Sequence, residues 1–259
     1  MVILKTNNVA KLLFLLSYLV SGATLASSSV SNTLLKDTLN RLSPYVITLS
    51  AGPTWTNGGE TQTFYLAPSI QKTYTANKNT STIFDGELFL GIERALRANL
   101  QGQLGLAVAA TSDASLSGDI WDDADSRFNN FNYKYKIQHT HIAIKGKLLR
   151  DIGHVLKPYV SGSVGVGFNQ AHNYNSTPTI FAAVPTPNFT SNMTTAFTYT
   201  VGLGLQRAIN AHWKASAGYE FADWGKSQLG IASGQTLGGG LSLNHLYTNG
   251  LQFSLSYCA

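Results

Sequence analysis

Cysteine is almost absent from the sequence. Cys258 is the single cysteine among 259 residues, so no disulfide can form within the chain and no zinc site can be built on cysteines. No cysteine stands directly after the N-terminal apolar segment, which argues against an N-terminal lipid anchor. The fold must therefore be held together by non-covalent contacts.

Charge is also scarce. Charged side chains make up 12% of the chain, against about 25% in an average soluble domain. With 44% hydrophobic residues, this composition argues against an ordinary soluble surface and against disorder. The formal net charge is +5; without Lys5 and Lys11, 16 basic and 13 acidic side chains leave +3. Positive charge this weak and dispersed predicts no nucleic-acid partner.

Long apolar runs are limited to residues 12–20, which follow Lys5 and Lys11 and precede small residues up to Ala26. This order is typical of a secretory signal peptide, predicted over residues 1–26 with cleavage after Ala23 or Ala26. The run is shorter than the roughly 20 residues of a membrane-spanning helix. No later run approaches that length, so any membrane insertion must use strands.

Residues 27–43 form a polar lead-in to the rest of the chain. Leu35, Leu39 and Leu42 have helical spacing, and Pro44 ends the segment. A short periplasmic helix and a flexible linker both fit this pattern.

From Pro44 onward the apolar residues alternate with period two. Eight segments each have one apolar face and one face rich in Gly, Ser and Thr, and most have about the 9–11 residues of a tilted membrane-spanning strand. These segments are residues 45–55, 84–93, 100–109, 141–148, 159–168, 197–206, 213–221 and 251–257.

Short and long connections alternate strictly between these segments. The long ones are residues 56–83, 110–140, 169–196 and 223–250. Alternation of this kind is typical of outer-membrane barrels with short periplasmic turns and long extracellular loops. We therefore predict an all-β fold over residues 44–259, an eight-stranded antiparallel transmembrane β-barrel that closes to leave no open sheet edge in lipid.

A soluble lipocalin-like barrel would place the apolar face inside instead. The charges on the polar faces favour a transmembrane barrel with a packed lumen. In the lumen we expect Glu87 and Glu93 to pair with Lys145 and Lys147, and Lys214 and Glu220 to join this ionic network. Eight strands leave just enough width for side chains to fill, so no large aqueous pore is expected.

Aromatic residues gather near both ends of the predicted strands. Two such belts are expected where a barrel crosses the two interfaces of a membrane, with outer-membrane lipid as the partner. Tyr45, Trp213 and Tyr257 fall near the short turns. Trp55, Phe168, Tyr199 and Phe221 fall near the long loops.

Three stretches resemble small outer-membrane barrels of the opacity-protein and surface-antigen family. They are PYVSGSVGVGFNQA (residues 158–171), GYEFADWGKSQLG (residues 218–230) and the tail LYTNGLQFSLSY (residues 246–257). The resemblance implies the outer membrane of a Gram-negative bacterium, with insertion by the barrel-assembly machinery through the final strand. It also implies surface adhesion, envelope structure or minor solute passage.

Candidate chemical sites are weak. His245 has no acid near it in sequence, because Asp223 stands at the far side of a long loop, and a histidine without an orienting acid is a poor general base. His139 and His141 share a strand face, but no third metal ligand is evident. The aspartates of residues 119–125 do not match a calcium-binding EF-hand and indicate a solvated acidic loop. No catalytic residue, metal or cofactor is predicted.

The sequence thus predicts a non-enzymatic surface or envelope protein whose loops are available for adhesion or for recognition of a host or extracellular ligand. Residues 169–195 include three prolines and the apolar Ile180, Phe181 and Val184, which either contact a partner or pack on other loops. A narrow channel for small or apolar solutes is the alternative, and a lipid-modifying hydrolase is a third possibility.

Overall fold

The computed structural model describes residues 45–259 except 79, 182 and 184–186. The predicted signal peptide (residues 1–26) and lead-in (residues 27–43) lie outside the described residues, as does Val184. Within the described part, no helix is long and apolar enough to cross a membrane.

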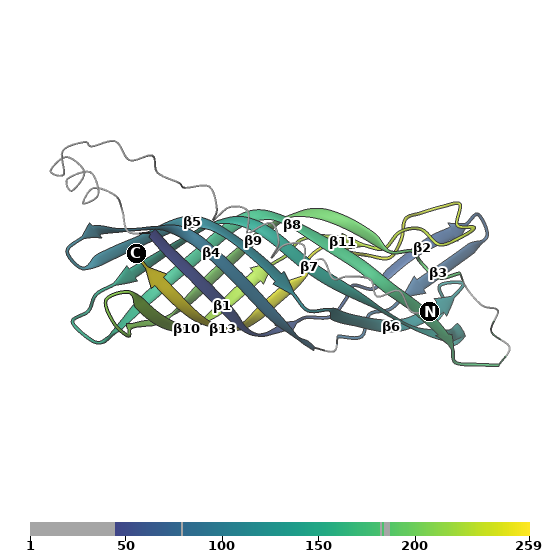
Figure 1. Ribbon diagram of the computed structural model, residues 1–259. Coiled ribbons are helices and arrows are strands. Elements are labelled where there is room, and N and C mark those ends of the chain that lie inside the picture. Colours follow the sequence, from purple (N-terminus) through teal and green to yellow (C-terminus); the bar gives the residue numbers. More distant parts are fainter. Residues whose placement is uncertain (1–44, 79, 182, 184–186) are drawn as a thin grey trace, which may run out of the picture. The chain divides into compact units, whose positions relative to one another are not determined.

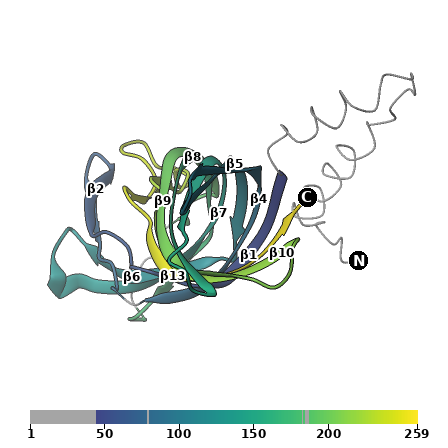
Figure 2. The same cartoon turned by 90° about the vertical axis from the view of Figure 1, so that its left-hand side faces the viewer.

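Eight long strands form a closed antiparallel ring (Figures 1 and 2). In ring order they are β1 (Tyr45–Thr56), β4 (Ser81–Arg97), β5 (Leu100–Thr111), β7 (Asn129–Arg150), β8 (Leu156–Pro178), β9 (Asn192–Ala208), β10 (Trp213–Asp223) and β13 (Tyr247–Cys258). Because β13 pairs with β1, the ring has no open edge. Each strand contains a predicted segment, so the predicted fold class is confirmed.

The apolar faces of the strands point away from the axis of the ring. Leu49, Leu90, Val164 and Leu203 are 64%, 47%, 52% and 62% exposed, whereas their polar neighbours Ser50, Glu87, Ser163 and Thr200 are buried inside. A soluble barrel with an apolar ligand cavity is therefore excluded. Transfer of such apolar surface out of water is favourable by about 25 cal/mol for each Å². Lipid around the ring provides the apolar surroundings for this transfer.

The connections between the long strands are short at one end of the ring. Residues 98–99 join β4 to β5, residues 151–155 join β7 to β8, and residues 209–212 join β9 to β10. The chain enters β1 and leaves β13 at this same end (Figure 1). The predicted alternation of short and long connections is therefore observed.

At the other end the expected long loops are largely β-structure. β7 and β8 have 22 and 23 residues and stay paired up to Phe131 and Pro178. Beyond the ring, β6 (Ala114–Asp122) pairs with β7, β3 (Ile70–Tyr74) with β6, and β2 (Gln62–Ala67) with β3. We call β2, β3 and β6, together with residues 129–137 of β7 and the paired residues 171–178 of β8, the extension. The expectation of loops at residues 56–83, 110–140, 169–196 and 223–250 was wrong wherever these residues form strands.

The extension has an apolar core of its own. Its buried members include Leu66, Leu116, Ile120, Phe131, Leu229 and Leu246. The aromatic rings of Phe64, Tyr74, Tyr133, Tyr174 and Phe189 contact one another in a chain with centroids 5.0–6.3 Å apart. The last connection contributes to this core and has a small sheet of β11 (Ser227–Gln228) and β12 (Ser242–Leu243). A buried core of this kind makes the extension a folded structure rather than a set of free loops.

Candidate functional site: lumen, mouth and extension

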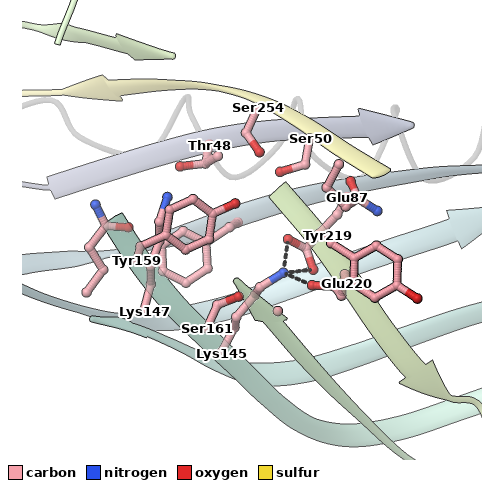
Figure 3. A pocket seen from close by; sticks show the side chains of 14 residues that line it. Thr48, Ser50, Glu87, Lys145, Lys147, Tyr159, Ser161, Tyr219, Glu220 and Ser254 are labelled. Atoms are coloured by element: carbon pink, nitrogen blue, oxygen red, sulfur yellow. Dashed lines mark hydrogen bonds and ion pairs between the residues drawn. The ribbon is translucent and has the colours of Figure 1, made fainter. Parts of the chain in front are cut away.

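A three-residue ion cluster crosses the lumen. Lys145 Nζ on β7 lies 2.7 and 2.8 Å from the two carboxylate oxygens of Glu87 on β4, and 3.0 Å from Glu220 Oε2 on β10 (Figure 3). All three side chains are largely buried. A buried charge is costly unless it is paired. The cluster pairs these charges and so connects β4, β7 and β10 across the lumen.

A second ion pair lies closer to the short turns. Lys214 Nζ is 2.6 Å from Glu93 Oε1, and Gln103 Nε2 donates to Glu93 Oε2 at 2.6 Å. Lys147 instead donates to Gln206 Oε1 at 2.6 Å and lies 4.0 Å above the ring of Tyr159. Of the six charges predicted to form one network, the structure therefore joins three in one cluster and two in another. It gives Lys147 an amide and an aromatic partner.

The lumen between these groups is filled. The cavity around Lys145, Lys147 and Tyr159 has a volume of about 40 Å³ and is drawn in Figure 3. A cavity needs about 10–15 Å³ on this measure to hold one water molecule. The space at this level of the lumen therefore suits a few ordered water molecules.

His139 and His141, which share one face of β7 and are both buried, take part in a chain of hydrogen bonds. Asn169 Nδ2 donates to the carbonyls of Trp224 and Lys226, so Asn169 Oδ1 accepts from His139 Nδ1 at 2.6 Å. Neutral His139 then accepts at Nε2 from His141 Nδ1, 3.0 Å away. His139 also stacks on Trp224 with ring centroids 4.4 Å apart. Across the described residues, no three His, Cys, Asp or Glu side chains are placed to share a metal ion.

The mouth of the ring has a histidine–aspartate pair that corrects the sequence interpretation. His245 Nδ1 lies 2.8 Å from Asp223 Oδ2, although we expected the long connection to keep them apart. Asp223 ends β10 opposite Tyr247 on β13, and this pairing brings the two ends of the connection together. The imidazole stacks on Tyr247, and among the described residues no hydroxyl or thiol is hydrogen bonded to it.

The acidic segment near the tip is occupied by internal contacts. The carboxylate of Asp122 accepts hydrogen bonds from Lys72 Nζ at 2.6 Å and from Asn130 Nδ2 at 2.7 Å. Asp125 caps the short 3-10 helix η1 (Ser126–Phe128). The Arg127 guanidinium that donates to Asp125 lowers the pKa of this carboxyl from its usual value.

Aromatic side chains lie at both ends of the membrane-facing wall. Near the short turns, Trp213 packs against Tyr257 with centroids 5.2 Å apart, and Tyr45 is exposed on the neighbouring strand. At the other end, Tyr199 and Phe221 contact each other. Trp55 and Phe168 lie on the outward faces of β1 and β8.

Tyr247 extends this second group, because it stacks on Phe221 with centroids 5.9 Å apart. We did not predict Tyr247 as a belt residue. Its signal was present in the sequence, since it continues the outward phase of Leu251 and Phe253 on β13.

Together these features define the class of the protein. The ring is closed, its outside is apolar, its inside is polar and its two ends have aromatic side chains. Only helices and closed barrels satisfy every backbone group inside a bilayer, and an antiparallel barrel with short turns at one end is the outer-membrane form. The chain is an integral outer-membrane β-barrel.

No protein-family model matches the sequence, and no curated protein matches it as a relative. The solved structures to which this chain is similar include three outer-membrane proteins. The first is the Neisserial surface protein A, with 12% identity, 83% of this chain and 96% of that chain covered, and a TM-score of 0.43. The second is the outer membrane protease OmpT from Escherichia coli, with 8% identity, 83% and 97% covered, and a TM-score of 0.48.

The third is Ail, the attachment invasion locus protein of Yersinia pestis, with 13% identity, 84% and 99% covered, and a TM-score of 0.33. Similarities at this level say nothing about activity. The fold implied by the resemblance to the opacity-protein and surface-antigen family is the fold that the strand ring has.

Proposed function

We propose that the protein is a non-enzymatic surface protein of the outer membrane whose extension recognises an extracellular partner. The observation that carries this proposal is the extension, in which β7 and β8 run on beyond the ring and support three further strands over a buried core. A segment with its own core holds its surface in a fixed shape. A fixed surface binds a partner without the entropic cost of ordering a loop.

The filled lumen supports this proposal over the narrow-channel alternative. The Lys145 cluster and the Lys214–Glu93 pair occupy the interior at two levels. We expect no porin-sized conductance steps from the purified protein in planar bilayers. Such steps from the wild-type protein would contradict a filled lumen.

An exposed apolar patch at the tip of the extension is the best candidate contact. Phe181 is fully exposed, and Phe128 and Ile180 are about half exposed. The hydroxyl of Thr179 donates to the Asn129 carbonyl, and this contact holds the two segments of the patch together. Exposed apolar groups that gather at one place mark interaction sites more often than isolated ones do.

A surface-expression experiment tests this function. Bacteria expressing the wild-type chain are expected to attach to epithelial monolayers above the vector control. The double substitution Ile180→Ser and Phe181→Ser should lower attachment several-fold. Ile209→Ser is the control, because Ile209 is also an exposed apolar residue but lies in a short turn at the opposite end. The patch is rejected if the wild-type strain attaches no better than the vector strain, or if the double variant attaches as the wild type does.

Hydrolysis is the second candidate, and the Asp223–His245 pair favours it. Asp223 is buried and His245 is half exposed, so the carboxylate orients an imidazole that solvent reaches. We expect no change in phospholipid products between the wild-type protein and His245→Ala, since no hydroxyl or thiol is hydrogen bonded to His245 in the described part of the chain. Loss of a hydrolytic product in both His245→Ala and Asp223→Asn would instead establish an enzyme.

Insertion by the barrel-assembly machinery, removal of residues 1–26 and the identity of the extracellular partner stay predictions.

A further inference from the structure

The outer wall of the barrel has an apolar groove near the short turns. It has a volume of about 620 Å³, within the range of about 300–1,000 Å³ that is common for small-molecule sites. Glycines form its floor because they leave the wall without side chains: Gly102 on β5, Gly146 on β7 and Gly162 on β8. Its apolar sides come from Ile92, Leu96, Leu104, Leu148 and Val160.

The strand registers make this groove continuous. Gly146 pairs with Gly162 across β7 and β8, and Leu148 pairs with Gly102 on one side and with Val160 on the other. Ile92, Leu96, Leu104, Leu148 and Val160 are all exposed on the lipid-facing side. The hollow therefore opens into the hydrocarbon region of the membrane rather than into water.

Arg94 lies in the part of the groove near the short turns, between Ile92 and Leu96 on β4. It pairs with Gly102 on β5, and its exposed side chain lines the groove. Ile92, two residues earlier, pairs with Tyr45 of the short-turn aromatic group. This register places Arg94 at the interface, where lipid headgroups lie, and Ile92 and Leu104 deeper in the wall.

We propose that this groove binds one glycerophospholipid of the periplasmic leaflet, with an acyl chain over the glycine floor and the phosphate at Arg94. An apolar hollow in hydrocarbon is filled by the chains around it, because an empty one loses dispersion contacts. Guanidinium groups bind phosphate oxygens through two parallel hydrogen bonds. The positive charge of Arg94 therefore selects a lipid with an anionic headgroup, whose acyl chain fills the groove.

The proposal depends on the barrel spanning the outer membrane with its short turns in the periplasm, and not on what the extension binds. The probe is the detergent-purified barrel incubated with phosphatidylglycerol or phosphatidylcholine and analysed by native mass spectrometry. The wild-type protein is expected to retain one phosphatidylglycerol, in preference to phosphatidylcholine.

Groove-filling variants test the floor. A Cβ at Gly146 would meet its nearest neighbour, a backbone oxygen, at 3.9 Å, and one at Gly162 at 3.5 Å. Both are ordinary contacts, so Gly146→Leu and Gly162→Leu should fold and should abolish the bound lipid. Gly86→Leu is the matched control, since Gly86 faces outward on β4 away from the groove and a Cβ there has similar space. It should retain the lipid.

A substitution of Arg94 tests the proposed contact with the lipid headgroup. Arg94→Gln should weaken the preference for phosphatidylglycerol about tenfold, which corresponds to about 1.4 kcal/mol. Arg97→Gln, at the next exposed arginine on β4, should leave this preference unchanged. The mobility shift on boiling in detergent gels reports folding of every variant.

The proposal is overturned if the folded wild-type barrel retains no phospholipid, or if the filled variants retain it as the wild type does. Equal loss in Gly86→Leu would also overturn it, because the bound lipid would then be general to the wall. In each case the gel shift still reports whether the barrel itself is intact, and attachment of whole cells tests the extension separately.

Discussion

Tyr74 and Tyr133 pack edge to face in the core of the extension, with ring centroids 5.8 Å apart, but only one of the two hydroxyls is paired. Tyr133 Oη donates to the Thr75 carbonyl at 2.9 Å. Tyr74 Oη is buried without a hydrogen-bond partner. A buried polar group without a hydrogen-bond partner destabilises the folded state, whereas a hydrogen-bonded one stabilises it.

Removal of each hydroxyl should therefore have opposite effects. Tyr74→Phe should raise the free energy of unfolding of the extension by about 1 kcal/mol, and Tyr133→Phe should lower it by a similar amount. Hydrogen exchange of the β6 and β7 amides measures this difference. Equal destabilisation by the two variants would mean that Tyr74 Oη has a partner.

Alkaline pH should weaken the extension. Burial raises the pKa values of Tyr74, Tyr133 and Tyr174 above the usual value of about 10. Since these hydroxyls hold their protons more tightly in the folded state, their contribution to stability is intact below about pH 10 and is lost as the pH rises through the folded-state values.

Near-ultraviolet circular dichroism should therefore show loss of extension packing above about pH 10. The absorbance of tyrosinate should rise over the same range. A signal that disappears well below this pH would assign the loss to other groups.

The lumen cluster should be sensitive to removal of its single cation. Lys145→Met leaves Glu87 and Glu220 buried and uncompensated, and breaking a buried ion pair in this way costs about 3–5 kcal/mol. Urea unfolding in liposomes, followed by the gel shift, measures the cost. The triple variant with Glu87→Gln and Glu220→Gln added should recover most of it, because no unpaired charge remains.

Three of the four tryptophans should differ in their access to lipid. In single-tryptophan variants, lipids brominated near the headgroup should quench Trp55 and Trp213, which lie at the two ends of the wall. Trp224 should not be quenched, since it is buried against His139. Quenching of Trp224 as strong as that of Trp213 would contradict the described packing.

The eight spans were predictable because the signal is local. Alternation of Leu49 with Ser50, or of Val164 with Ser163, is enough to define a strand with one apolar and one polar face. The inward phase of Glu87, Lys145 and Glu220 followed from the same alternation. The partner of each charged side chain did not follow from it, because the pairing depends on the stagger between neighbouring strands. Lys147 therefore lies beside Gln206 rather than a carboxylate.

The extension was missed for a different reason. Phe131, Tyr133 and Tyr135 alternate with Asn132 and Lys134 in the same period as the membrane strands, so its strand signal was readable. The expected length of a membrane span ended the predicted strand too early. The approach of His245 to Asp223 is not local at all, since it arises only when β10 and β13 pair.

Continuity of β7 and β8 from the ring into the extension has a mechanical consequence. Residues 129–137 of β7 alone extend the hairpin by about 30 Å at roughly 3.3 Å per residue. A pull on the tip along these strands loads many backbone hydrogen bonds at once rather than one at a time. The cell envelope itself would then bear the tension of an attached bacterium in flowing liquid.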